Sequence, residues 1–228
     1  SIDGGENWTV ASQGYTGALM FDLAVHPTNA ATLYATARSG IFRSTNRGQT
    51  WQGLSYSPAF MVETYAVALK SDNPQIVLAA EELNGVVQRS TDGGNSWTLV
   101  YTLPGVIPGD PNTAMGFKRM VFSTAPGSTN LVYAGTCRGV NLLKPTDTCI
   151  GVYKSPDGGL TWQETNVANI DTQCINDLAI HPQYPGIIFA ATVSGGLLRT
   201  MDGGTTWVAL SLPASDVQSV AIRPDNPD

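Results

Sequence analysis

The sequence predicts an all-β fold built from a repeated unit of four short antiparallel strands. The first observation is an octet ending in tryptophan, which occurs five times and accounts for all five tryptophans of the 228-residue chain. The second is that alternating apolar segments recur between the octets with a period of about 45 residues. Four short strands per period are typical of a β-propeller blade.

Each octet reads as a tight β-hairpin turn. Its first residue is Ser or Thr and its third is Asp or Asn, and such side chains bond to nearby backbone N–H groups. The glycines that follow supply positive φ angles, and the tryptophan buries a large ring that anchors the turn. We therefore expect structural roles for one polar residue and one tryptophan in each octet: Asp3 and Trp8, Asn46 and Trp51, Asp92 and Trp97, Asp157 and Trp162, and Asp202 and Trp207.

The strands are predicted from the segments around the octets, taken in chain order. A first strand ends in a proline turn, a second follows, a third runs into the octet, and a fourth leaves from the tryptophan. The first strands lie at 22–27, 177–182 and 219–224, the second at 32–36, 76–80, 131–135 and 187–191, and the third at 40–43, 85–89, 151–154 and 196–199.

These strands divide the chain into one propeller segment that is entered and left within a blade. The predicted units are 1–17 (end of a blade), 18–59, 60–114, 115–173 with insertions, 174–215, and 216–228 (first strand of a next blade). We therefore expect a segment of a larger propeller, of about seven blades or more.

Composition limits the possible partners. The chain carries 12 Lys and Arg against 18 Asp and Glu, a net charge of −6, which argues against nucleic acid or an anionic membrane surface as partner. No apolar run approaches the roughly 18 residues of a membrane span, so we expect no membrane insertion. Both histidines, His26 and His181, precede a proline in the same repeat position, which favours a structural turn. We expect no cofactor and no metal.

The third unit departs from the repeat, because Trp97 and Trp162 are further apart than any other successive pair. The extra residues fall in two loops, 101–117 and 137–151, which emerge on the face opposite the octets. Inserted loops commonly carry binding sites. The candidate binding residues here are Tyr101, Asp110, Lys118, Arg119, Arg138 and Lys144. They form either a patch that contacts a sugar or an anion, or an ordinary solvated rim.

Two of the three cysteines, Cys137 and Cys149, bracket the second loop. Hairpin geometry would bring them close enough to bridge, so we predict a Cys137–Cys149 disulfide and an oxidising compartment. Metal binding is the weaker alternative, because the chain has no Cys-x-x-Cys motif. Cys174 is then expected to be a buried free thiol.

The octets and the strands between them resemble the Asp-box (BNR-repeat) β-propellers. That superfamily includes sialidases, xyloglucan-cleaving glycoside hydrolases, sortilin-type receptors and photosystem-assembly factors. The resemblance implies the fold and says little about function. The Arg-Ile-Pro motif of sialidases has no match here. Xyloglucan-cleaving members carry an acid in a turn of an early blade, whereas the comparable turn 37–40 has none.

Glycoside hydrolysis would need two carboxyl groups about 5 to 10 Å apart. If the chain is an enzyme, the candidates are Asp22 and Asp177, which share a repeat position, and Glu81 and Glu82, with Glu63 and Asp216 nearby. The alternative for the shared position of Asp22 and Asp177 is that it caps strand ends. A hydrolase would also line its cleft with aromatic residues such as Tyr15, Tyr56, Phe60 and Tyr65.

Three functions remain open from the sequence. The leading hypothesis is a secreted, cell-surface or periplasmic binding or scaffold module for a protein or a polysaccharide, acting through the enlarged loop face. The second is a glycoside hydrolase of the xyloglucanase type. The third is a structural subunit that assembles with copies of itself.

Overall fold

The computed structural model describes residues 6–7, 9, 13–14, 19–54, 63–110, 115–138, 151–165, 174–213 and 215–223. In this part of the chain the secondary structure consists of strands, arranged as four separate four-stranded antiparallel sheets. The all-β fold class predicted from the repeat is therefore confirmed. The described residues include no helix long and apolar enough to cross a membrane.

Each sheet is one blade, with its strands paired in sequence order. Blade 1 holds β1 (Met20–Val25), β2 (Leu33–Ala37), β3 (Gly40–Ser44) and β4 (Gln52–Gly53), and blade 2 holds β5 (Thr64–Leu69), β6 (Val77–Glu81), β7 (Val86–Ser90) and β8 (Thr98–Thr102). Blade 3 holds β9 (Met115–Phe122), β10 (Val132–Arg138), β11 (Val152–Ser155) and β12 (Gln163–Glu164), and blade 4 holds β13 (Ile175–Ile180), β14 (Ile188–Thr192), β15 (Leu197–Thr200) and β16 (Val208–Ala209).

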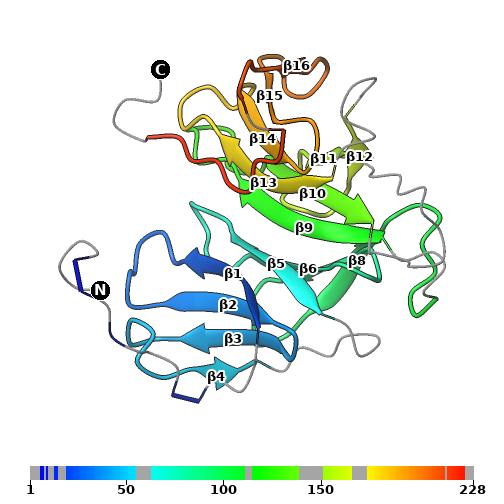
Figure 1. Cartoon of the computed structure of the whole chain (residues 1–228). Helices are drawn as coiled ribbons and strands as arrows, with labels where there is room; N and C mark the ends of the chain where they lie inside the picture. Colours follow the sequence, from blue (N-terminus) through cyan, green and yellow to red (C-terminus); the bar gives the residue numbers. More distant parts are fainter. Residues whose placement is uncertain are drawn as a thin grey trace.

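The four blades follow one another around an arc (Figure 1). The first strands β1, β5, β9 and β13 lie on its inner side, and each is in contact with the next. The core is divided among the seams between blades. Between blades 2 and 3, Leu78, Phe117 and Trp162 belong to one buried cluster, and between blades 3 and 4, Tyr133, Ile175 and Trp207 belong to another.

The octets that the structure describes are the turns between the third and fourth strands. In residues 90–97, the Ser90 hydroxyl donates to Asp92 Oδ1 at 2.7 Å and accepts the Gly94 N–H at 2.8 Å. Asp92 Oδ1 also accepts the Ser96 N–H at 2.9 Å. Hydrogen bonds from Ser96 and Ser90 lower the pKa of Asp92 to about 2. Asn46, Asp157 and Asp202 bond in the same way, whereas Asp3 and Trp8 lie outside the described residues.

The octet at 44–51 places an arginine where the other described octets place a glycine. Arg47 has a φ of 60°, and Gly93, Gly158 and Gly203 at the same position have φ of 69°, 75° and 73°. A side chain with a Cβ atom adopts this left-handed conformation at a cost. The turn geometry is therefore imposed by the octet hydrogen bonds even where the residue is not glycine.

The disulfide prediction is wrong. Cys137, in β10, is bonded to Cys174, which precedes β13, with their Cα atoms 4.6 Å apart. Cys174 is therefore not a free thiol, and Cys149 lies outside the described residues. Hairpin geometry brings together partners within one blade, whereas β10 also lies against β13 of the next blade. The approach is close enough that a Cβ atom on Gly135 would lie 2.4 Å from Ile175.

Candidate functional site

Each inner strand contains a one-residue β-bulge opposite the second strand of its blade. The extra residues are Phe21 in β1, Tyr65 in β5, Lys118 in β9 and Asn176 in β13. We call these four residues the bulge row. They lie near the strand ends where the turns between second and third strands emerge, opposite the octets. Because β-bulges re-aim side chains and are common beside active sites, the bulge row marks the candidate site.

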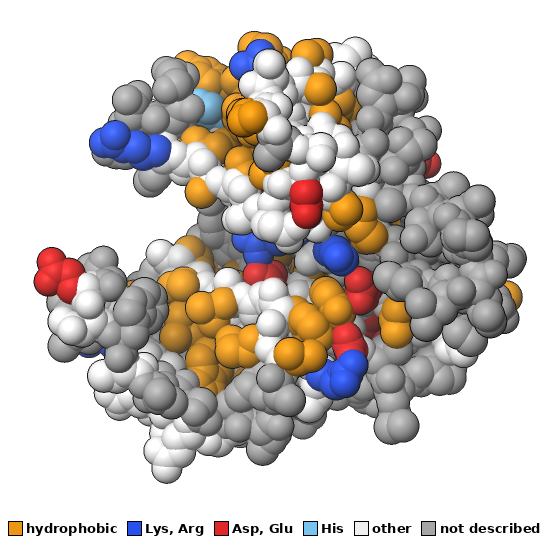
Figure 2. All heavy atoms as spheres, viewed as in Figure 1, with side chains coloured by type: hydrophobic (Ala, Val, Ile, Leu, Met, Phe, Trp, Pro, Cys, Tyr) orange, Lys and Arg blue, Asp and Glu red, His pale blue; other side chains and the backbone are white. Residues whose placement is uncertain are grey.

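The two bulge-row residues of blades 1 and 2 belong to a connected cluster of aromatic and charged side chains. The rings of Phe21 and Tyr65 stack with centroids 3.9 Å apart and planes 14° apart. The carboxyl groups of Glu82 and Glu63 lie close enough to the Tyr65 hydroxyl to raise its pKa. Arg38, in the turn after β2, forms an ion pair with Glu63. Figure 2 shows acidic and basic side chains gathered in a band across the middle of this view, with hydrophobic side chains beside it.

The electrostatics of this cluster centre on Glu82. Burial raises the pKa of Glu82 above its ordinary value of 4.5, and the neighbouring Glu63 raises it further, while the Tyr65 hydrogen bond and Lys118 act in the opposite direction. Burial, followed by Glu82 and Glu63, also raises the pKa of Tyr65. Burial is the largest influence on the pKa of both Glu82 and Tyr65.

The residue after each bulge forms a second row, which we call the axial row: Asp22, Ala66, Arg119 and Asp177. Arg119 Nη1, in blade 3, forms an ion pair with Asp22, two blades away in blade 1. Its Nε lies 2.9 Å from Asp177 Oδ1, but this N–H is not aimed at the oxygen and makes no hydrogen bond. Arg119 thus connects the inner strands of blades 1, 3 and 4.

Both aspartates of the axial row also accept hydrogen bonds from backbone N–H groups. Asp22 accepts the N–H groups of Leu23 at 2.9 Å and Val67 at 3.1 Å, so it joins β1 to β5. Asp177 accepts the N–H of Val220 at 3.1 Å in the corresponding way. Burial raises the pKa of Asp22, with Arg119 opposing. Since the oxygens of Asp22 and Asp177 are occupied by these partners, the geometry favours a structural role for this pair.

The other candidate residues are dispersed. Glu81 is fully buried, and its Oε2 accepts the Asn84 side-chain N–H at 2.8 Å. Asn84 in turn accepts the Gly109 N–H at 3.0 Å, so Glu81 supports the loop after β8. Tyr101 packs its ring against those of Phe117, Tyr153 and Trp162 in the seam between blades 2 and 3.

Asp110 is partly exposed at the end of the same loop, and Asp216 is exposed. The Arg138 side chain and residues Lys144, Tyr15, Tyr56 and Phe60 lie outside the described residues. Within the described part of the chain, no three His, Cys, Asp or Glu side chains are grouped so that they could hold a metal ion.

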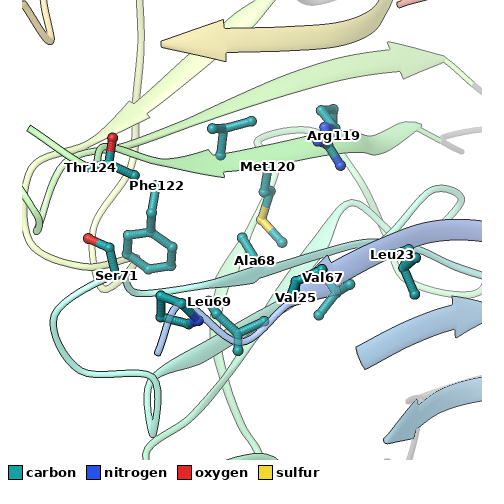
Figure 3. Close-up of a pocket in the computed structure, with 13 residues that line it drawn as sticks. Leu23, Val25, Val67, Ala68, Leu69, Ser71, Arg119, Met120, Phe122 and Thr124 are labelled. Atoms are coloured by element: carbon teal, nitrogen blue, oxygen red, sulfur yellow. The ribbon is translucent and has the colours of Figure 1, made fainter. Parts of the chain in front are cut away.

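A shallow apolar groove of about 230 Å³ runs beside the axial row. Figure 3 shows Met120 and Phe122 pointing from β9 toward β5, with Leu23 and Val25 on β1. Arg119 lies at one end of this groove. The groove is therefore an apolar surface of the inner strands, next to the polar cluster of the bulge row.

Sequence reasoning missed Phe21, Arg38 and Asn176 and named Tyr65 only as one of several aromatic residues. A usable signal was present, because Asp22 and Asp177 align in the repeat and the preceding residues are Phe21 and Asn176. The bulge that turns those residues into a separate row depends on cross-strand register, which the sequence pattern does not contain.

Comparisons with known proteins place the chain among propellers. No protein-family model matches it. It is 27% identical, over 92% of its length, to a xyloglucanase from Paenibacillus sp., and 32% identical, over 54% of its length, to the xyloglucanase Xgh74A of Acetivibrio thermocellus. The chain covers 23% and 16% of these two proteins, so it spans less than a quarter of their length.

Solved structures agree on the fold. The GH74 xyloglucanase from Xanthomonas campestris superposes with a TM-score of 0.67 at 21% identity, over 90% of this chain and 34% of that one. The Dos1 propeller superposes with a TM-score of 0.63 at 14% identity, over 91% of this chain and 51% of that one. Similarity at this level of identity shows the architecture alone: the chain has the fold of a segment of a β-propeller.

Proposed function

We propose that this chain is part of an extracellular Asp-box propeller that binds a polysaccharide of the xyloglucan class along the bulge row. The observation that carries the proposal is the cluster of Phe21, Tyr65, Glu63 and Glu82, which combines stacked rings with carboxyl groups. Ligand sites typically combine aromatic side chains with a few placed polar groups that fix orientation. The sequence similarity to xyloglucanases supports a polysaccharide as the ligand.

The charges of the cluster favour an uncharged ligand. Arg38 is paired with Glu63, and Lys118 acts on Glu82, so each cation has an acidic neighbour. A site that binds an anionic polymer would present cations without such partners. The chain also has a net charge of −6. Neutral polysaccharide therefore fits the site better than a uronic-acid polymer does.

Binding is tested by affinity gel electrophoresis and calorimetry of the whole chain with xyloglucan, using polygalacturonate as the anionic comparison. Tyr65→Ala removes the stacked ring, and we expect a loss of at least about 10-fold in affinity, the size typical of a buried aromatic anchor. The matched control is Tyr184→Ala, a 56% exposed tyrosine beside His181 in the turn on the opposite face. Equal binding by the wild type and Tyr65→Ala would refute the site.

Hydrolysis is a second candidate, favoured by one observation. Burial and the neighbouring Glu63 raise the pKa of Glu82, and a general acid in a glycosidase needs a raised pKa. The test is release of reducing ends from xyloglucan by the wild type and by Glu82→Gln. Hydrolysis predicts activity that Glu82→Gln abolishes while binding is kept. A chain that binds xyloglucan and releases no reducing ends supports the binding module alone.

Two alternatives have separate readouts. A propeller that binds protein would fail the xyloglucan assay and would lose a protein ligand in Tyr65→Ala. A self-assembling subunit would sediment as an oligomer at low concentration without any ligand.

The extracellular location is supported by the Cys137–Cys174 disulfide, since disulfides persist in oxidising compartments.

A further inference from the structure

The first two seams between blades are each bridged by an arginine of the third strand. Arg43 Nη1, in β3, donates to the Gly93 carbonyl in the octet of blade 2 at 2.9 Å. Arg89 Nε, at the same position of β7, donates to the Gly158 carbonyl in the octet of blade 3 at 3.1 Å. In both seams the basic side chain of one blade is therefore hydrogen-bonded to the octet of the next.

The third seam, between blades 3 and 4, has a lysine at that position. Among the described residues, Lys154 Nζ has neither a hydrogen bond nor an ion pair, and it lies 5.7 Å from the centre of the Tyr133 ring. The carbonyl of Gly203, the counterpart of Gly93, accepts the Tyr133 hydroxyl at 3.0 Å. Because an ammonium group carries three donors, Lys154 is able to bond to a ligand that accepts.

A second, shorter side chain widens the same seam. Leu54 and Thr165 each lie three residues after an octet tryptophan. In the first seam, a Cβ atom on Gly94 would lie 2.7 Å from Leu54, and in the third seam one on Gly204 would lie 2.8 Å from Thr165. Threonine is shorter than leucine and adds a hydroxyl group. A polar pocket of about 200 Å³ lies in the third seam, and it is lined by Lys154, Gln163, Glu164, Thr165 and residues 203–205.

The strand register decides which side chains face this pocket. Lys154 pairs with Gln163 across β11 and β12, and Tyr153 pairs with Glu164. Directly paired residues share one face of a sheet, so Gln163 lies on the pocket face with Lys154. Glu164 lies on the other face, where its charge raises the pKa of Tyr101 and Tyr153. The charge on the pocket face is therefore that of the lysine.

The two threonine hydroxyls of the pocket are acceptors toward a ligand. The Thr165 hydroxyl donates to the Val152 carbonyl at 2.9 Å, and the Thr205 hydroxyl donates to the Asp202 carbonyl at 3.2 Å. A hydroxyl has a single proton to donate, so both oxygens can only accept from a further partner. A ligand that bonds to Lys154 must accept, whereas one that bonds to these hydroxyls must donate.

The octet of blade 4 is also less fully hydrogen-bonded than its counterparts. In blade 3, Trp162 Nε1 donates to the Gly159 carbonyl at 3.0 Å, and the octet of blade 2 has the same bond. Trp207 is 5% exposed, and its Nε1 makes no hydrogen bond within the described ranges of the chain. The counterpart of Gly159 is Gly204, which lines the pocket. The pocket therefore lies against an octet that has unused hydrogen-bonding groups.

We propose that the seam between blades 3 and 4 is a second carbohydrate site, which binds one neutral sugar ring on the octet side of the molecule. Sugar hydroxyls both accept and donate, as Lys154 and the threonines require. A carboxylate or phosphate would only accept, and it would also meet the charge of Asp202, which acts on the neighbouring Tyr133. A volume of about 200 Å³ is below the roughly 300 Å³ at which sites for drug-sized ligands begin, so the pocket suits a single ring. It lies at the octet ends of the strands, opposite the bulge row, and does not depend on the function proposed there.

The experiment titrates the isotope-labelled whole chain with methyl β-D-glucopyranoside and, separately, with methyl α-D-xylopyranoside. The backbone amide NMR signals of residues 203–205 report on the pocket, and that of Tyr65 reports on the bulge row. We expect saturable shifts at 203–205 with at least one of the two sugars. Lys154→Ala should weaken this binding by at least about 10-fold, the size typical of losing a hydrogen bond to a charged group.

Two further variants fill the pocket with side chains that another seam already contains. Lys154→Arg copies Arg43, and Thr165→Leu copies Leu54, so both should abolish the shifts at 203–205 while the other amide signals stay those of a folded chain. The matched control is Arg199→Ala, because Arg199 has the same strand position in blade 4 and does not line the pocket. This control should bind both sugars as the wild type does.

Sodium acetate and sodium phosphate are titrated as anionic comparisons. The proposal is overturned if neither sugar shifts the signals of 203–205, if either anion shifts them at a lower concentration than the sugars do, or if Lys154→Arg binds as the wild type does. Tyr65→Ala separates the two sites: the shifts at 203–205 should persist in it, whatever happens to xyloglucan binding. Their loss in Tyr65→Ala would mean that the seam is not a separate site.

Discussion

Replacing Arg119 by methionine tests whether the axial row holds the blades together. The change keeps an unbranched apolar stem of similar reach and removes the guanidinium between Asp22 and Asp177. Both aspartates then keep their positions near the axis without a counter-ion. If these carboxylates are structural, as their backbone contacts indicate, the chain should lose stability.

The expected loss follows from burial. The Asp22 and Asp177 side chains are 8% and 14% exposed, and the Arg119 side chain is 31% exposed. Removing one partner of a fully buried pair costs about 3–5 kcal/mol. Water reaches Arg119 in part, which weakens the pairing, so we expect a loss of about 2–3 kcal/mol. For a chain of this size that corresponds to a fall in Tm of about 5–10 °C.

The assay is thermal unfolding followed by tryptophan fluorescence, with Arg199→Met as the matched control. Arg199 has no bonded partner in the described structure, so its removal should change Tm by less than about 1 °C. If Arg119→Met unfolds within about 1 °C of the wild type, the axial row does not hold the blades.

The pH dependence of the folding stability tests the role of Arg119 independently. Burial raises the pKa of Asp22 above 3.8 in the folded chain, so between that value and the folded pKa the native state binds more protons than the unfolded state. The contribution of Asp22 to stability therefore falls as the pH rises through this window. Loss of Arg119 raises that pKa further. The deficit of Arg119→Met should accordingly be smaller at pH 4 than at pH 7.

Three further predictions concern the octets and the disulfide. The pKa of Asp92 is lowered to about 2, so its ionised carboxylate stabilises the fold above pH 3.8, and this stabilisation is lost as the pH falls toward 2. Urea midpoints should therefore show that Asp92→Asn is less stable than the wild type at pH 5 and nearly as stable at pH 2. Arg47→Gly should raise stability by about 0.5–1 kcal/mol by removing a left-handed non-glycine residue. Peptide mapping without reductant should find Cys137 joined to Cys174 and Cys149 alkylated, and Cys137→Ser should cost about 4 kcal/mol for a separation of 37 residues. A Cys137–Cys149 peptide would contradict the structure.

The fold could be predicted because its signals are local. In an octet, the hydrogen bonds of Asp92 reach residues at most four positions away, and the strands on either side alternate with the period of a sheet. The disulfide could not be predicted in the same way. Cys137 and Cys174 belong to different blades, and their contact depends on how one sheet packs against the next.

The candidate site was predicted only in part for a related reason. Glu63, Tyr65, Glu82 and Lys118 were all named from the sequence, but nothing there brought them together. Their contacts depend on bulges in β5 and β9. Arg119 was predicted beside Lys118 in one basic patch, and the bulge separates them, because Lys118 belongs to the bulge row and Arg119 to the axial row.

The two rows show how a repeated scaffold produces a surface that is not repeated. The bulge occurs at the same position in all four described inner strands, so the backbone directs one side chain per blade to the same rim. The side chains themselves differ: phenylalanine, tyrosine, lysine and asparagine. The axial row beneath them places Arg119 between two aspartates that bind the neighbouring strands. A ligand on the rim would therefore meet a different chemical group at each blade. A chain polymer with distinct successive contacts uses such a row better than a small symmetric ligand does, which is the physical reason for favouring a polysaccharide.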